Sequence, residues 1–166
     1  MTTAKTQTGD PRREMLRHTV ATLAYRAAKS LESAPEKFAR FRTLETSRTP
    51  DQILAHLGDL FDWALRVAKG DFTYTEAIPL PWEREVARFF AALKAFDDYL
   101  ASDAPLAIPA EQIFQGPIAD ALTHVGQLAM LRRMAGAPIR GESYVRAEIV
   151  AGRVGPIQST KRFEFD

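Results

Sequence analysis

Four segments of this sequence repeat apolar residues at intervals of three and four positions, which is the period of an α-helix with one buried face. Proline or glycine residues mark the places where these segments begin or end. We expect helices at about 11–32, 50–69, 82–101 and 116–136. The pattern predicts an all-α fold, a four-helix bundle, in which connections of about a dozen residues require at least one crossover or an active lid.

The starts of these helices carry recognisable signals. Thr49 or Ser47, followed by Pro50 and Asp51, supplies a helix N-cap, a first-turn proline and an acid near the positive helix end. Gly116 and Pro117 are expected to open the fourth helix, after a short turn at 112–115. The aromatic stripe of the third helix is interpreted as core rather than as a cofactor site.

The chain of 166 residues is long enough for one domain with a shielded core, so we expect a single domain over 1–166. Residues 1–10 are polar and are expected to form a flexible N-terminus. The C-terminal extension, 141–166, is expected to contain a short helix of two turns within 143–152. The rest of it should form an extended tail that lies on the bundle.

Charge and cysteine content exclude several classes of protein. The 22 basic and 21 acidic residues are interspersed, so no patch for nucleic acid or an anionic membrane is visible, and neither partner is expected. The chain has no cysteine, which excludes disulfides, thiolate zinc sites and cysteine nucleophiles. No apolar run is long enough to span a bilayer, and the first ten residues lack a signal sequence, so we expect a cytoplasmic protein.

Polar residues interrupt the apolar surface of the fourth helix. Asp120, His124 and Gln127 fall within about 60° of one another on a helical wheel. The opposite face of the same helix is also apolar, which predicts a helix enclosed by its neighbours. A carboxylate buried there would cost several kcal/mol unless it lost its charge, formed a pair or coordinated a metal. The polar stripe therefore needs a partner.

A metal site is one solution. Asp120 and His124 lie one helical turn apart, which is a spacing by which a helix presents two ligands to one cation. His56 lies at the edge of the apolar arc of the second helix, where it can face a cleft between helices, and Trp63 shares this edge and could wall the cleft. Two imidazoles and one carboxylate would leave coordination positions open, as in a catalytic metal site.

The same residues also have structural interpretations. Asp120 and His124 could form a buried hydrogen-bonded pair with an arginine of another helix. His56 alone would be an ordinary histidine at a helix edge. Gln127 is either a second-shell donor to the metal site or a core amide bonded to a backbone carbonyl.

Other polar residues near the fourth helix have weaker signals. Tyr144 and Ser143 follow this helix through a short loop, and we expect them to close over the site as second-shell or substrate-binding groups. Arg132 and Arg133 form either a solvated face or a grip for an anionic substrate. His18 has no partner in the sequence and is assigned to the surface or to packing.

The segments TPDQILAHL, at 49–57, and DALTHVGQLAMLRRMAGAPI, at 120–139, resemble the DinB/YfiT-like superfamily of bacterial four-helix proteins. The resemblance extends from the first helix to about residue 140. In that family a metal is commonly held by three histidines, and the resemblance implies that His56, Asp120 and His124 take these roles here. The chain departs from the family pattern at Asp120, where histidine is commoner, and at Val125, where arginine is frequent.

The resemblance implies a metal-dependent enzyme with a small-molecule substrate. Characterised relatives include transferases and isomerases that use a thiol cofactor, so the expected chemistry is transfer or hydrolysis by an activated thiol or water. We expect zinc or nickel, with iron or manganese as alternatives, and possible use of a low-molecular-weight thiol. A homodimer is expected. The alternative is a noncatalytic metal- or ligand-binding helical module that acts as a dimeric interaction or stress-response protein.

Overall fold

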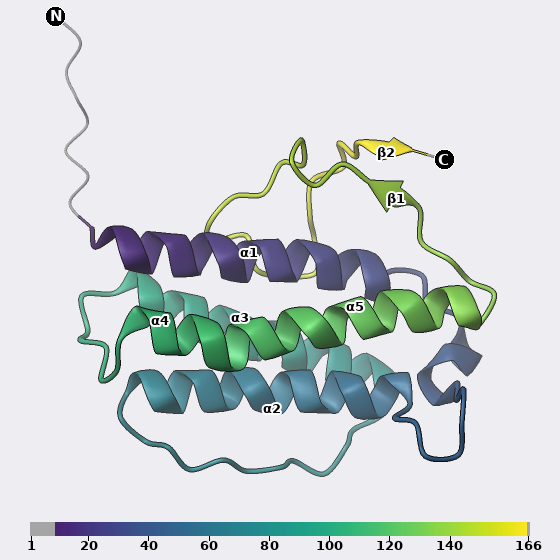
Figure 1. Cartoon of the computed structure of the whole chain (residues 1–166), viewed down its shortest axis with the longest axis horizontal. Helices are drawn as coiled ribbons and strands as arrows, with labels where there is room; N and C mark the ends of the chain where they lie inside the picture. The colour runs from purple at the N-terminus through teal and green to yellow at the C-terminus, as the bar shows by residue number, and fades with distance from the viewer. Residues whose placement is uncertain (1–8, 166) are drawn as a thin grey trace, which may run out of the picture.

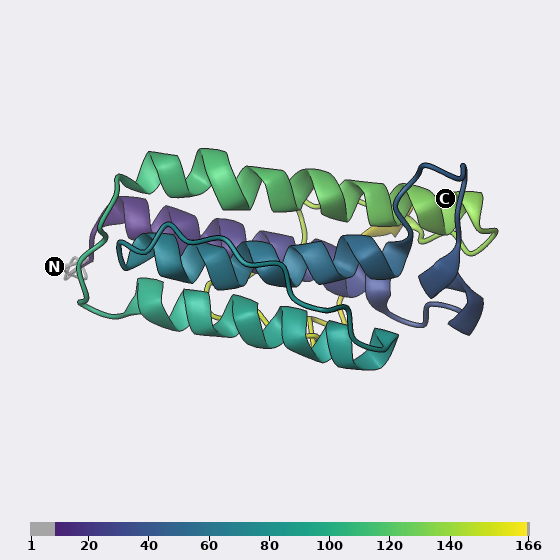
Figure 2. The same cartoon turned by 90° about the horizontal axis from the view of Figure 1, so that it is seen from below.

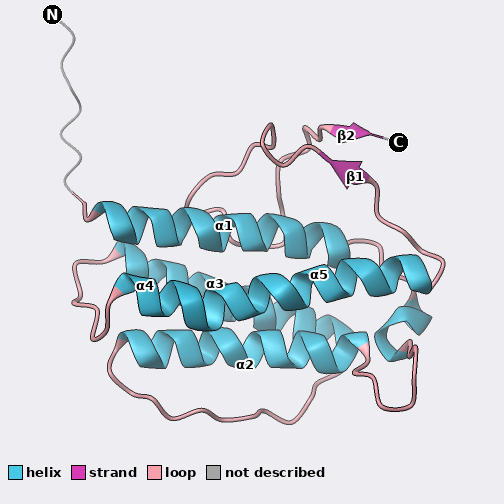
Figure 3. Ribbon diagram, viewed as in Figure 1, coloured by secondary structure: helices cyan, strands magenta, loops and turns pink. Residues whose placement is uncertain are grey.

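The computed structural model describes residues 9–165. The flexible N-terminus expected at 1–10 falls largely on residues 1–8, which lie outside the described residues. Most of the described chain is helical, which confirms the all-α expectation, and its two strands have two residues each (Figure 3). In chain order the elements are α1 (Pro11–Leu31), η1 (Glu36–Arg40), α2 (Pro50–Ala68), α3 (Trp82–Ala101), α4 (Ala110–Ile113), η2 (Phe114–Ile118), α5 (Ala119–Met134), β1 (Gly141–Glu142) and β2 (Glu164–Phe165).

The four long helices α1, α2, α3 and α5 lie side by side along the long axis of the molecule (Figures 1 and 2). α2 packs against α3, α1 packs against α3 and α5, and α5 also packs against α2. α2 and α3 run in the same direction, because residues 71–81 return along the outer side of α2 before α3 begins (Figure 1). We call residues 71–81 the strap. It is the crossover that the long connection requires.

Two of the long helices, α1 and α2, begin with capped first turns. The Asp10 side chain accepts a hydrogen bond from the Arg12 backbone N–H, and Pro11 occupies the first turn of α1. At the start of α2, Thr49 and Gln52 form a capping box, in which each side chain accepts from the backbone of the other. Thr49, rather than Ser47, is therefore the N-cap.

The expected start of the fourth long helix was wrong. Helical structure begins at Ala110 and continues through η2, a π-helical segment, into α5. Pro117 lies inside this helix instead of opening it. Proline lacks the N–H that a helix interior needs, and its ring crowds the preceding turn. The wider π turn gives that ring room, so the Gly116–Pro117 pair does not break the helix.

A single cluster of buried apolar residues lies between the helices. Its largest members include Phe61 of α2 and the α3 residues Phe89 and Phe96, all fully buried. The Phe61 ring centroid lies 6.2 Å from that of Phe89 and 5.9 Å from that of Phe96. Edge and tilted contacts at these distances stabilise aromatic pairs beyond their burial. The interpretation of the aromatic stripe as core is confirmed.

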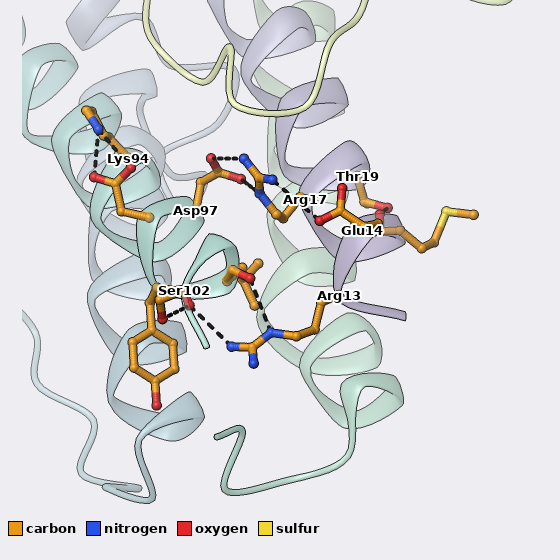
Figure 4. Close-up of polar contacts among 11 residues, drawn as sticks. Arg13, Glu14, Arg17, Thr19, Lys94, Asp97 and Ser102 are labelled. Carbon is orange, nitrogen blue, oxygen red and sulfur yellow. Dashed lines mark hydrogen bonds and ion pairs between the residues drawn. The ribbon is translucent and has the colours of Figure 1, made fainter. Parts of the chain in front are cut away.

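Two arginines of α1 fasten it to α3 (Figure 4). Arg13 donates to backbone carbonyls at the C-terminal end of α3, including Leu100 O at 3.2 Å, and to Ala104 O at 2.7 Å. Arg17 forms a two-pronged ion pair with the buried Asp97 carboxylate, at 3.1 and 3.3 Å. These bonds fix the axial position of α1 against α3 because paired buried charges tolerate little displacement.

The C-terminal extension differs from its expected form. Residues 143–152 make turns and bends rather than a helix of two turns. Gly152 has a φ of +90°, a conformation that ends helical structure, and the Ser143 N–H donates to Phe163 O instead of entering a helix. The expected extended tail folds back so that β2 pairs antiparallel with β1. Val154 is buried in the core cluster, which holds the tail on the helices.

Every helix within residues 9–165 is too short or too polar to traverse a lipid bilayer.

Candidate metal centre

Three side chains that are far apart in the sequence converge between α2 and α5. Asp120 Oδ1 lies 3.4 Å from His124 Nε2, and Asp120 Oδ2 lies 3.6 Å from His56 Nε2. The two imidazole rings stand perpendicular to each other, with centroids 4.8 Å apart. One ligand atom from each residue can be chosen so that all three atoms lie within 4.8 Å of one another. We call these three residues the site cluster.

The helices explain this convergence. Asp120 and His124 occupy successive turns of α5 and therefore project from the same face. His56 lies in the middle of α2, on the side that packs against α5. The π-helical segment η2 ends at Ile118, two residues before Asp120. Such segments are frequent at functional sites because they rotate the helix that follows.

Gln127 fixes the orientation of His124. Its Oε1 lies 2.9 Å from His124 Nδ1. An amide oxygen accepts hydrogen bonds but cannot donate them, so Nδ1 carries the proton and Nε2 keeps a free lone pair. That lone pair faces Asp120. Gln127 is exposed and bonded to an imidazole, so it is not a core amide, and in this bond it accepts rather than acting as the expected donor.

Tyr74 contacts His56 and was not singled out in the sequence. Its hydroxyl lies 3.1 Å from His56 Nδ1, which leaves His56 Nε2 directed toward Asp120. Tyr74 belongs to the strap, whose lack of regular period gave no signal for its position. The nearest sequence hint is a run of alternating aromatic and polar residues at 72–75.

Trp63 contributes through Tyr74 rather than by touching the site cluster. The two rings pack edge to face with centroids 6.0 Å apart, and the indole N–H donates to Phe72 O at 3.3 Å. Trp63 therefore holds the part of the strap that carries Tyr74. Trp63 does not wall the cleft beside the site cluster, as was expected, but lines a separate opening together with residues of the strap.

Buried charges hold the other half of the strap. The Asp59 carboxylate accepts from the Ala77 N–H at 3.3 Å, and Glu85 accepts from the Leu80 N–H at 2.7 Å. Arg88 forms an ion pair with each of these two acids, at 2.9 Å in both cases. Strap, α2 and α3 are thus joined by one charged network, which limits how far Tyr74 can move from His56.

The electrostatic environment of His56 favours the form of its imidazole that can bind a cation. Burial lowers the pKa of His56, and the neighbouring His124 and the positive charge of Arg48 lower it further, while Asp120 acts in the opposite direction. Burial also raises the pKa of the Tyr74 hydroxyl, so the hydroxyl stays protonated. His56 is therefore neutral at pH 7, which is the form that coordinates metals.

The site cluster is more exposed than its sequence predicted. The Asp120 side chain is 47% exposed, and those of His56 and His124 are 20% and 13% exposed. The expectation of a helix enclosed on all sides was wrong, because α5 packs mainly against α1 and α2 and leaves one face to solvent. The cost of burying Asp120 is consequently small. The exposed side also leaves a path by which a ligand can approach.

The donor set and its spacing fit a transition metal. Nitrogen and carboxylate ligands lie about 2.0–2.2 Å from zinc, so neighbouring ligand atoms around a tetrahedral ion are about 3.4 Å apart. The His124 Nε2 to Asp120 Oδ1 distance is 3.4 Å and the His56 Nε2 to Asp120 Oδ2 distance is 3.6 Å, which are near this spacing and long for hydrogen bonds. Within residues 9–165, no other group of three histidine, aspartate or glutamate side chains meets the same geometric criterion.

Tyr144 does not lie at the site cluster. Its ring packs on Tyr25 of α1, with centroids 6.2 Å apart, and the Arg26 guanidinium carbon lies 3.9 Å from its centroid. The chain leaves α5 toward α1, away from α2, so Tyr144 cannot close over the site. Ser143 lies beside it and donates its backbone N–H to Phe163 O.

The remaining sequence candidates have structural positions. Arg132 is buried and donates to Ser30 O and Glu32 O at the end of α1, so it is neither a solvated face nor a substrate grip. Arg133 is exposed. His18 is exposed on α1, in agreement with its assignment to the surface.

Comparison with known proteins gives no relative: the chain matches no protein-family model, no curated protein and no solved structure.

Proposed function

We propose that this chain is a four-helix bundle of the DinB/YfiT type that binds one divalent transition metal through His56 Nε2, His124 Nε2 and an oxygen of Asp120. The observation that carries the proposal is the convergence of these three atoms, with each imidazole held at Nδ1 by a separate hydrogen-bond partner. Imidazole ligands of metals in proteins are oriented in this way. The sequence resemblance, made on the same three residues, points to the same site.

The ligand set favours particular metals. Two imidazoles and one carboxylate suit zinc, nickel or iron(II), and three protein ligands leave positions open for small molecules. Bound there, the metal would supply Lewis acidity that lowers the pKa of a coordinated water or thiol. The protein has no cysteine, so the thiol of a transfer reaction would come from a small-molecule cofactor.

The residues of the chain have separate tasks in this proposal. His56, Asp120 and His124 hold the metal. Gln127 accepts from His124 Nδ1 and so keeps the Nε2 lone pair of His124 available, while Tyr74 orients the His56 ring. The carboxylate balances part of the metal charge, which three histidines would not do. The function proposed is thus a metal-dependent transferase or hydrolase that acts on a small molecule.

Metal analysis tests this proposal. The protein, purified without chelator and dialysed against Zn²⁺, is expected to retain one equivalent, and His124→Ala is expected to retain none. His18→Ala is the matched control because it removes an exposed histidine outside the site cluster. Co²⁺ bound in place of zinc should give the absorption spectrum of a site with low symmetry and a low coordination number. Absence of stoichiometric metal in the wild-type protein, or equal retention by His124→Ala, would contradict the proposal.

Turnover separates an enzyme from a metal-binding module. The zinc and nickel forms should be assayed with several low-molecular-weight thiols and electrophilic substrates, beside ester and amide hydrolysis. Metal-dependent turnover that His124→Ala lacks is expected. Stoichiometric metal without turnover on any of these classes would favour the noncatalytic module.

A further inference from the structure

A cleft of about 550 Å³ opens beside the site cluster. The residues before α2 and the first turn of α2 form one wall, and α5 from His124 to Met134 forms the other. A helix rises about 1.5 Å per residue, so this second wall is about 15 Å long. His124 and Gln127 line the cleft, so an occupant can reach the site cluster without crossing the protein interior.

The walls of the cleft are largely apolar. Ile53, Leu131, Met130 and Met134 line it, and the two methionines are 63% and 53% exposed. Large apolar side chains left open beside polar groups are typical of ligand sites, and methionine adapts to ligands of different shape. The apolar surface lies along α5 at the end of the cleft away from Asp120.

Arg48 supplies the charge of the cleft. It is the one arginine or lysine among the lining residues, and no carboxylate lines the cleft. Within residues 9–165 its guanidinium forms no ion pair or hydrogen bond with the protein. Arg48 directly precedes Thr49, the N-cap of α2, and its charge acts on both His56 and Tyr74. The cleft therefore combines a cation that has no partner among residues 9–165 with the site-cluster residue His124 and with an apolar surface along α5.

We propose that the cleft binds an amphipathic carboxylate, whose carboxylate contacts Arg48 beside the site cluster and whose apolar tail lies along Met130 and Met134. The part of this inference that makes the carboxylate a substrate of the metal site rests on the proposed function. Two other openings differ from this cleft. One of about 690 Å³ also contains Met130 and Met134, but Glu142 lines it together with Arg133 and Arg140. The opening that Trp63 lines likewise has acidic and basic residues together. A free guanidinium binds a carboxylate through two parallel hydrogen bonds, and a ligand that carries an amine or an alcohol instead cannot form this pair of bonds.

Three probes that share a phenylbutyl group and differ in their polar end test which charge the cleft prefers. The affinities of 4-phenylbutyrate, 4-phenylbutanol and 4-phenylbutylamine should be measured by calorimetry, first on metal-free protein and then with one equivalent of Zn²⁺. The carboxylate is expected to bind about tenfold or more tightly than the alcohol, and the amine most weakly. Equal affinity of all three probes, or no binding of the carboxylate in either form, would overturn the proposal.

Variants of Arg48 and Met130 test where the charged end and the apolar tail of the ligand bind. Arg48→Gln should remove the preference for carboxylate over alcohol, whereas Arg48→Lys should keep part of it. Arg40→Gln is the control, since it removes an exposed arginine of the neighbouring η1 that does not line the cleft. Met130→Ala should weaken the carboxylate and the alcohol by a similar factor. Unchanged preference in Arg48→Gln would contradict the assignment of the charged end.

The two proposals fail in different ways. Carboxylate-selective binding to metal-free protein that takes up no zinc would support the cleft and contradict the metal site. Stoichiometric zinc with no preference among the probes would support the metal site and overturn the cleft. Binding that strengthens in the zinc form supports both, because it places the carboxylate within reach of the metal.

Discussion

Two polar clusters in this molecule are each built around one carboxylate, and they are completed to different degrees. The site cluster surrounds Asp120, and a second cluster, which we call the tail cluster, surrounds Glu142 of β1. Tyr25 and Lys29 of α1 donate to the two oxygens of Glu142 at 2.5 and 2.7 Å, and Glu164 of β2 accepts from the same lysine at 2.8 Å. The Glu142 side chain has no exposed surface.

In the tail cluster each charge has an opposite charge or a short hydrogen bond. Asp120, by contrast, is half-exposed and has imidazole nitrogens at 3.4 and 3.6 Å, which is farther than a strong hydrogen bond reaches. A completed buried cluster fixes the fold, because any change leaves a charge without a partner. An incomplete and accessible one keeps lone pairs free for a ligand. The difference separates a structural use of charge from a functional one.

The largest effect on stability is expected when Glu142, the central acid of the tail cluster, is replaced. Glu142→Ala leaves the buried Lys29 ammonium with one partner and should lower the free energy of unfolding by about 3–5 kcal/mol. Glu148→Ala is the control, because Glu148 is exposed and its contacts with Ser159 and Lys161 lie at the surface. It should cost little, because exposed ion pairs contribute little to stability. Chemical denaturation measures both values, and equal costs would remove the distinction between the clusters.

Alkaline pH should weaken the tail cluster next. Burial, then the hydrogen bond to Glu142, raises the pKa of Tyr25 from 10.0 to about 12. The folded protein therefore keeps the phenolic proton where the unfolded chain loses it, and stability falls as pH rises from about 10 to about 12. A pKa difference of about 2 corresponds to about 3 kcal/mol.

The measurement is unfolding free energy against pH, with tyrosinate absorbance as a second reading. Tyr25→Phe should be less stable at pH 8 but should lose this part of the alkaline decline. A wild-type stability curve that is parallel to that of Tyr25→Phe above pH 10 would contradict the role of the Tyr25 proton.

The site cluster should respond in metal affinity rather than in stability. Tyr74→Phe and Gln127→Leu each remove the group that orients one imidazole, and each should weaken zinc binding about 10- to 100-fold. Competition with a chromophoric chelator measures this. Tyr144→Phe is a suitable control because its ring lies on α1, and it should leave the affinity unchanged. Equal affinities in all three variants would show that the imidazoles need no such support.

The success of sequence reasoning followed the regularity of the backbone. The spacing of Asp120, His124 and Gln127 fixes their common direction on any helix, so their grouping could be predicted. His56 could be added because its helix edge was readable from the apolar arc of 50–69. The all-α class followed from the same periodicity. None of these conclusions needed the loops.

The failures fall where periodicity carries no information. Tyr74 lies on the strap, whose path depends on buried charges of α2 and α3 that no local pattern reveals. Tyr144 was placed at the site because it follows α5 closely, but chain proximity does not tell toward which neighbour a loop turns. Pro117 was taken as a helix start because a π turn that accommodates it has no simple sequence signature. Burial of α5 was overestimated because Met130 and Met134, although apolar, face solvent.

The smallest expected effect gives the sharpest contrast with Glu142→Ala. Asp120→Ala, measured without metal, should change the free energy of unfolding by no more than about 0.5 kcal/mol. Its carboxylate is half-exposed, and its His56 partner is neutral at pH 8, because burial lowers the pKa of that imidazole. Alanine is also the better helix former. The same variant should lose zinc binding. If Asp120→Ala instead cost as much as Glu142→Ala, Asp120 would be a structural acid, and two imidazoles alone would be too few ligands for the proposed centre.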